Sequence, residues 1–160
     1  SLGERQATAL ISPLSALGIT HIVSSPMHRA IGSIQPLARA SGLNIGLDDD
    51  LRERDTGERP SHLWSTDMER LLAHPDHAEY GGESANDVIL RGHAAVDRAK
   101  QAGPVPLIVS HGQWISLMLG QFGRGVTSEE WRTMPRPALF RVKGAAWAPV
   151  PLDLSINALS

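Results

Sequence analysis

The chain has 160 residues, of which 41% are hydrophobic and 20% charged, and its formal net charge is −2. These values suit one globular domain with a substantial core and give no reason to expect nucleic acid as a partner. No apolar run approaches the roughly 20 residues of a membrane-spanning helix. The absence of cysteine excludes disulfides and thiolate metal sites, and it favours a cytoplasmic protein.

The first predicted element is a helix over residues 4–17, where apolar side chains recur at helical spacing. Pro13 is expected to kink or split this helix, because proline lacks an amide donor and crowds the preceding turn. Gly18 suits the C-cap. A short apolar run over residues 19–24 then predicts a strand.

A second helix is predicted directly after this strand. Ser25 suits the N-cap and Pro26 the first helical position. The helical pattern continues to about Ser41 and ends at Gly42. Alternating residues over 43–47 predict a second strand.

The next segment, residues 48–82, is rich in turns and holds a short predicted helix over 66–73. We expect it to overhang one edge of the sheet. Ser84 and Asp87 then have the spacing of an N-cap and an acidic first turn. They predict a long helix that ends near Ala102.

The remaining pattern gives a strand over 105–110, a helix over 113–122 and an apolar strand near 138–142. The proline-containing tail is predicted to be an edge strand or a loop. Strands that alternate with helices indicate an α/β fold with a layered (αβα), mostly parallel sheet. The whole chain, residues 1–160, is predicted to form a single domain.

Two predicted strands end in the same way, each running almost directly into a helix without an acidic first turn. Arg29 follows the first strand, and His111 with Gly112 follows the later one. The carboxyl ends of parallel strands share one edge of a sheet, so these residues predict an anion pocket there. The backbone amides of Gly112, Gln113 and Trp114 are expected to face the same point. The alternatives are a solvated Arg29 and a His111 satisfied by a neighbouring carbonyl.

Other residues give weaker signals. Glu53 lies in a charged sequence that reads as a solvated turn, and a lone carboxylate is not by itself a general acid. The other histidines show no metal-binding spacing, and no phosphate-binding glycine loop or serine-hydrolase elbow is present. No metal ion and no cofactor are predicted.

Several short motifs, in this order, make the chain resemble the histidine phosphatase superfamily with its phosphoglycerate-mutase-like fold. The resemblance runs from the first residues to about Gly120, with residues 137–142 similar to a late strand. The motifs are Leu2-Gly3-Glu4-Arg5-Gln6-Ala7, Ser24-Ser25-Pro26 with Arg29-Ala30, Leu51-Arg52-Glu53 with Gly57, Gly81-Gly82-Glu83-Ser84, and Val109-Ser110-His111-Gly112.

This resemblance implies a metal-independent phosphomonoester hydrolase. Arg29 is then expected to clamp the phosphoryl group and His111 to stabilise its charge, with Gly112 and Gln113 also contacting the substrate. Glu53 is expected to protonate the leaving alcohol. A nucleophilic histidine attacks phosphorus, and water later cleaves the phosphohistidine.

The sequence departs from the family pattern in two places. In the family the nucleophile belongs to an Arg-His-Gly motif at the end of a central strand, which precedes the helix that begins here at Leu2. That motif and strand are absent from the given chain, so we expect an N-terminally truncated domain that is itself inactive. In addition, Thr56 precedes Gly57 where the family often has an aromatic residue, which affects substrate contacts more than the chemistry.

Three functional hypotheses stay open at this point. A phosphatase is preferred to a mutase, because the region between Glu53 and Gly81 is short. The second hypothesis is an inactive pseudophosphatase that keeps a phosphate- or protein-binding pocket, and the third is an unrelated α/β binding domain. The expected partner is a small phosphate ester, with no nucleic acid and no membrane. The sequence does not identify the ester, and association into a homo-oligomer stays open.

Overall fold

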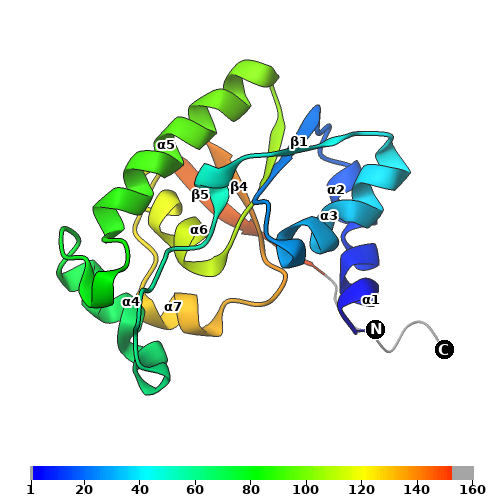
Figure 1. The fold of residues 1–160 in the computed structure, drawn as a ribbon. Helices are drawn as coiled ribbons and strands as arrows, with labels where there is room; N and C mark the ends of the chain where they lie inside the picture. Colours follow the sequence, from blue (N-terminus) through cyan, green and yellow to red (C-terminus); the bar gives the residue numbers. More distant parts are fainter. Residues whose placement is uncertain (1, 153–160) are drawn as a thin grey trace.

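The computed structural model of the protein describes residues 2–152 (Figure 1). Within this range the chain forms a three-stranded sheet, a separate two-stranded sheet and helices around both. The strands are β1 (His21–Ser24), β2 (Ile45–Leu47), β3 (Pro106–Val109), β4 (Leu139–Lys143) and β5 (Ala146–Val150). The helices are α1 (Leu2–Ala9), α2 (Ile11–Ser15), α3 (His28–Ser41), α4 (Trp64–Ala73), α5 (Ala85–Ala102), α6 (Gly112–Leu119) and α7 (Ser128–Thr133), with short 3₁₀ turns at Asp49–Leu51, Ser61–Leu63 and Glu79–Gly81.

The larger sheet is parallel and has the order β2-β1-β3. Ile22 of β1 pairs with Ile45 of β2, and Ser24 pairs with Val109 of β3. The last residues of β1 and β3 are therefore level with each other. This register brings the segments that follow the two strands to the same edge of the sheet.

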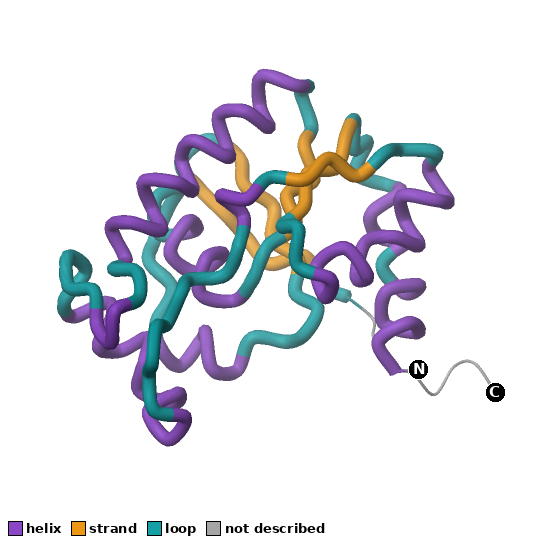
Figure 2. Tube along the Cα trace, in the orientation of Figure 1, coloured by secondary structure: helices purple, strands orange, loops and turns teal. Residues whose placement is uncertain are grey.

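Helices cover both faces of this sheet, as Figures 1 and 2 show. Successive side chains of a strand point to opposite faces. Ile22 and Leu107 pack in a core cluster with α2 and α3. Val23 and Ile108 pack on the other face against the cluster built by α4 to α7. The layered α/β fold with a parallel sheet, which the sequence predicted, is confirmed.

The first predicted helix is split, as Pro13 suggested. Helix α1 ends at Ala9 and α2 begins at Ile11. Proline has no amide hydrogen to donate to the carbonyl four residues earlier, and Ala9 is that residue. Gly18 has a φ of +67°, which a side chain would disfavour, so the chain turns there toward β1.

The predicted start of α3 is wrong by two residues. The helix begins at His28, and Met27 is its N-cap in an extended conformation. Ser25 is fully buried, and its hydroxyl contacts His111 while accepting a long hydrogen bond (3.3 Å) from the Met27 amide. A tertiary contact thus holds this serine where a local pattern predicted a cap. The predicted helix end is confirmed, with Gly42 at φ +70°.

Helix α5 begins as predicted, because Ser84 and Asp87 form a reciprocal capping box. The C-terminal part differs more from the prediction. Helix α7 was not anticipated, and the predicted late strand is one arm of the antiparallel β4–β5 hairpin rather than a strand of the parallel sheet. No helix within residues 2–152 is long and apolar enough to cross a bilayer.

Candidate active site

The carboxyl edge of the parallel sheet brings together two residues that lie 82 positions apart in the sequence. Arg29 lies in the first turn of α3, and His111 is the N-cap of α6. The backbone amide of Ser25 donates to the carbonyl of Val109 (2.9 Å), which joins the two strand ends. Arg29 Nε lies 3.1 Å from His111 Nδ1. The predicted convergence of these two side chains is therefore present in the structure.

His111 is buried and has hydrogen-bond partners at both ring nitrogens. Because Nδ1 accepts from Arg29, the ring proton belongs on Nε2, which lies 2.8 Å from the hydroxyl oxygen of Ser25. Burial, and next the positive charge of Arg29, lowers the pKa of His111 from 6.5 to about 4. The imidazole is thus neutral at pH 7. The alternative that a backbone carbonyl satisfies this histidine is wrong.

Arg29 keeps most of its hydrogen-bonding capacity. Among residues 2–152 no carboxylate forms an ion pair with it, and its two terminal nitrogens have no hydrogen-bond partner. A guanidinium in this state can offer two parallel N–H donors to an oxyanion. Arg29 is exposed, as the solvated alternative expects, but its Nε also donates to the buried His111.

Glu53 lies at the amino end of α6 rather than in a solvated turn. Its carboxylate accepts hydrogen bonds from the amides of Gln113 (3.1 Å) and Trp114 (3.0 Å). A carboxylate at this place is favoured by the helix dipole and satisfies two otherwise free donors. The prediction that the amides of Gln113 and Trp114 stay free for an anion is therefore wrong, because Glu53 occupies both.

A cavity of about 860 Å³ lies beside these groups. Residues of β3 line it, and so do Thr56 and Arg59 of the segment between β2 and α4 and Trp64 of α4, so the turn-rich segment overhangs it, as predicted. A Cβ atom on Gly112 would lie 3.2 Å from the indole nitrogen of Trp131, so close packing here favours glycine. All five residues proposed from the sequence line this one cavity: Arg29, Glu53, His111, Gly112 and Gln113.

A buried polar cluster behind the cavity was not predicted. Arg54 donates to both carboxylate oxygens of Asp67 (2.8 and 2.7 Å) and to the side-chain oxygen of Gln113 (2.8 Å). The side-chain nitrogen of Gln113 also donates to Asp67 (2.6 Å), and Arg59 adds a further ion pair to it. Both ends of the Gln113 side-chain amide are therefore engaged within the protein.

Asp67 is 1% exposed. Burial alone would raise its pKa, but the hydrogen bond from Gln113 and the charges of Arg54 and Arg59 outweigh burial and lower it. One sequence signal for the cluster existed, because Asp67 shares the buried face of α4 with Met68 and Leu71. An acid on an apolar helix face requires a buried cation, but nothing in the sequence identified Arg54 as that cation.

Comparison with known proteins identifies the family of this chain. Residues 1–142 match the profile of the histidine phosphatase superfamily (branch 1). A probable phosphoglycerate mutase of Cronobacter sakazakii is 36% identical over 128 residues, which cover 73% of this chain and 59% of that protein. The chain spans about 60% of the length of the curated relatives that it matches.

Two solved structures have the same fold. A mycobacterial glucosyl-3-phosphoglycerate phosphatase, solved in complex with inorganic phosphate, has a TM-score of 0.66 at 21% identity and covers 94% of this chain and 84% of its own. YhfR of Bacillus stearothermophilus has a TM-score of 0.67 at 20% identity, with 98% and 84% covered. The sequence profile, the curated relatives and the fold agree: this chain belongs to the histidine phosphatase superfamily (branch 1).

Proposed function

We propose that this chain forms most of the catalytic domain of a metal-independent phosphomonoester hydrolase that works through a phosphohistidine. One observation carries the proposal: Arg29 and His111 meet at the carboxyl edge of the sheet, in a cavity that Glu53 also lines. Arg29 supplies charge and two free N–H donors to the phosphoryl group, while His111 supports its position. The phosphate bound to the mycobacterial relative supports an anion as the ligand.

We further propose that the nucleophilic histidine lies on a strand that pairs with β3. Within residues 2–152, β3 is an edge strand of the parallel sheet. Its residues Leu107, Ile108 and Val109 line the cavity, as do Ala138 and Leu139 at the start of β4. An apolar edge with unpaired amides and carbonyls favours the addition of a strand. A side chain at the end of such a strand lies near Arg29 and His111.

The reaction then has two steps. The histidine nitrogen attacks phosphorus, the ester P–O bond breaks, and the departing oxygen takes a proton from Glu53. Water next attacks the phosphorus of the phosphohistidine, the P–N bond breaks, and a proton of the water returns to Glu53. Inorganic phosphate leaves, and the histidine is free again. Arg29 stabilises the charge of the transferring group in both steps.

The first test measures hydrolysis of an aryl phosphate by the full-length protein in the presence of a chelator. We expect Arg29→Ala and His111→Ala each to lower kcat/KM by about 100-fold or more. Arg98→Gln is the matched control, because Arg98 is an exposed surface arginine that lies outside the cavity lining. Activity that the chelator abolishes, or that survives His111→Ala unchanged, would contradict the proposal.

A second measurement separates the hydrolase from the pseudophosphatase and the mutase. Rapid quenching in alkali, which preserves phosphohistidine, should trap one labelled phosphoryl group per protein. The label should then appear as inorganic phosphate and not on a second alcohol. A full-length protein that binds phosphate but never acquires the label would be a pseudophosphatase. The expected cytoplasmic location and the absence of a nucleic-acid or membrane partner stay predictions.

A further inference from the structure

The segment of residues 50–55, which carries Glu53, has little regular structure, yet side chains from other elements hold its backbone carbonyls. The carbonyl of Asp50 accepts from Arg91 (2.7 Å) and from the indole of Trp114 (2.9 Å). The carbonyl of Leu51 accepts from the hydroxyl of Ser110 (2.7 Å). Buried backbone groups need such partners, and here the partners determine the path of the segment.

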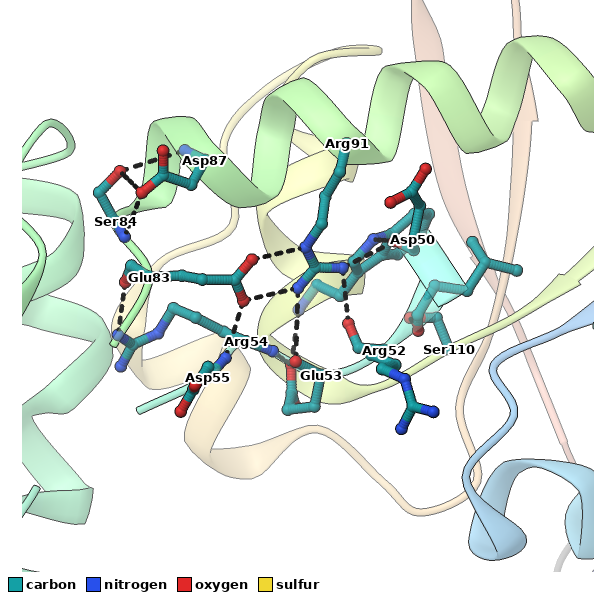
Figure 3. A network of polar contacts seen from close by, with 12 residues as sticks. Asp50, Arg52, Glu53, Arg54, Asp55, Glu83, Ser84, Asp87, Arg91 and Ser110 are labelled. Atoms are coloured by element: carbon teal, nitrogen blue, oxygen red, sulfur yellow. Dashed lines mark hydrogen bonds and ion pairs between the residues drawn. The ribbon is translucent and has the colours of Figure 1, made fainter. Parts of the chain in front are cut away.

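Arg91 of α5 makes most of these contacts, as Figure 3 shows. Besides Asp50, its guanidinium donates to the carbonyls of Arg52 (2.9 Å) and Glu53 (3.3 Å). The remaining N–H groups donate to the two carboxylate oxygens of Glu83 (2.7 and 2.9 Å). One planar side chain thus bridges three backbone carbonyls and a carboxylate, which the five fixed donors of arginine allow.

Glu83 holds the other end of the same segment. One of its carboxylate oxygens accepts from the amide of Asp55 (2.8 Å), and its own amide donates to the carbonyl of Asp55 (2.8 Å). The preceding Gly82 lies close to the same carbonyl, and a Cβ on it would lie 2.3 Å from that oxygen, so this close approach requires glycine. The capping box of Ser84 then starts α5 directly after it.

We propose that Arg91, paired with Glu83, is a positioning residue that fixes the backbone of residues 50–55 so that the Glu53 carboxylate stays at the amino end of α6 and beside the cavity. The role rests on the proposed acid function of Glu53. Arg91 donates to the two carbonyls on either side of the Glu53 Cα atom in the backbone, that of Arg52 and that of Glu53. Loss of these bonds frees the backbone from which the carboxylate projects.

A test of Arg91 has to distinguish the effect of its positive charge from the effect of its hydrogen bonds to the segment. Arg91 is among the cations that lower the pKa of His111, after burial and Arg29. Arg91→Lys keeps the charge and an ion pair with Glu83, but a single ammonium cannot bridge the carbonyls and both carboxylate oxygens. Arg98 provides the matched control on the same helix: it pairs with the carboxylates of Asp48 and Asp50 and touches no carbonyl of the segment.

The first experiment needs no catalysis. Amide NMR signals of Gln113 and Trp114 report the carboxylate of Glu53, and Glu53→Gln gives their positions when the charge is gone. We expect Arg91→Lys to move both signals at least halfway toward those positions, while Arg98→Lys leaves them in place. If Arg91→Lys lowers the melting temperature but leaves both signals where they are in the unmodified protein, Arg91 only stabilises the fold and the inference is wrong.

The second experiment measures kcat with two kinds of leaving group in the full-length protein. An alkyl phosphate needs protonation of its leaving oxygen, whereas a nitrophenyl phosphate needs it far less. Arg91→Lys should lower kcat about 10-fold or more for the alkyl ester, with little change in KM and a smaller loss for the nitrophenyl ester. Equal losses for both esters would overturn the inference. Shifted amide signals in a full-length protein without hydrolase activity would instead contradict the proposed function alone.

Discussion

Arg29 lines the cavity and Arg54 lies behind it, and the surroundings of these two arginines are opposite. Arg54 is buried, and each nitrogen of its guanidinium donates to a group of the protein, with Asp67 as the counter-charge. Arg29 donates to the neutral His111, and among residues 2–152 it has no carboxylate partner. The same side chain therefore has a structural role in one place and stays available to a ligand in the other. The difference is the presence of one buried acid.

Not every positive charge near the cavity is balanced by a carboxylate among residues 2–152. Arg54 and Arg59 share the single carboxylate of Asp67, so their cluster has one net positive charge behind the cavity. Arg29 adds a second positive charge at the carboxyl edge of the parallel sheet. Arg29 and Arg59 both line the cavity, together with the acidic residues Glu4 and Glu53, so its lining carries charges of both signs.

The largest expected effect comes from removing the counter-charge of Arg54. Asp67→Asn leaves buried guanidinium groups without their carboxylate, and breaking such a pair costs about 3–5 kcal/mol. We expect this loss in the free energy of unfolding, measured by urea denaturation. Glu69→Gln is the matched control, because Glu69 is an exposed acid on the same helix. A loss below about 1 kcal/mol in Asp67→Asn would show that Arg54 does not depend on this acid.

Removing Arg29 should have the opposite effect: stability should change little, and anion binding should weaken. Arg29→Gln breaks no ion pair among the described residues, so the free energy of unfolding should change by less than about 1 kcal/mol. Affinity for sulfate or vanadate, measured by calorimetry, should fall about 10-fold or more, which equals about 1.4 kcal/mol. Arg98→Gln should keep full affinity. If Arg29→Gln and the unmodified protein bind the anion equally well, Arg29 does not contribute to the anion site.

The neutral partner of Arg29, His111, should make stability depend on pH. The pKa of His111 is about 4 in the folded protein and 6.5 as an ordinary value. The unfolded chain therefore binds a proton more readily, and stability falls as the pH drops from about 6.5 toward 4. The expected loss from this residue is about 1 to 3 kcal/mol, since solvent reduces the effect. Urea denaturation at pH 7.5 and 4.5 should show a smaller loss in His111→Asn, and identical losses would contradict the burial of a neutral imidazole.

Much of the fold was predictable from local patterns. The spacing of apolar residues predicted the strands of the parallel sheet and the helices around it. Local cues predicted helix ends: Gly42 marked the end of α3, and Ser84 with Asp87 marked the start of α5. Pro13 correctly predicted a split helix. These features depend on residues within a few positions of one another, so a single sequence contains the whole signal.

The order of strands and helices also predicted one long-range contact, that of Arg29 with His111. Parallel strands must end at the same edge, so residues that directly follow two adjacent strands meet whatever lies between them. The sequence could not predict that Glu53 caps α6 or that Arg54 pairs with Asp67. Those contacts depend on how the irregular segment after β2 folds back over the sheet.

The layered fold, the family motifs and the contact between a guanidinium and an imidazole all follow from the order of residues along the chain. Which polar groups neutralise one another, and which remain available, depends on the three-dimensional packing. The reason is that a buried charge is neutralised by partners many positions away in the sequence. Irregular backbone segments bring these partners into contact. No periodic pattern along the chain records such a pairing.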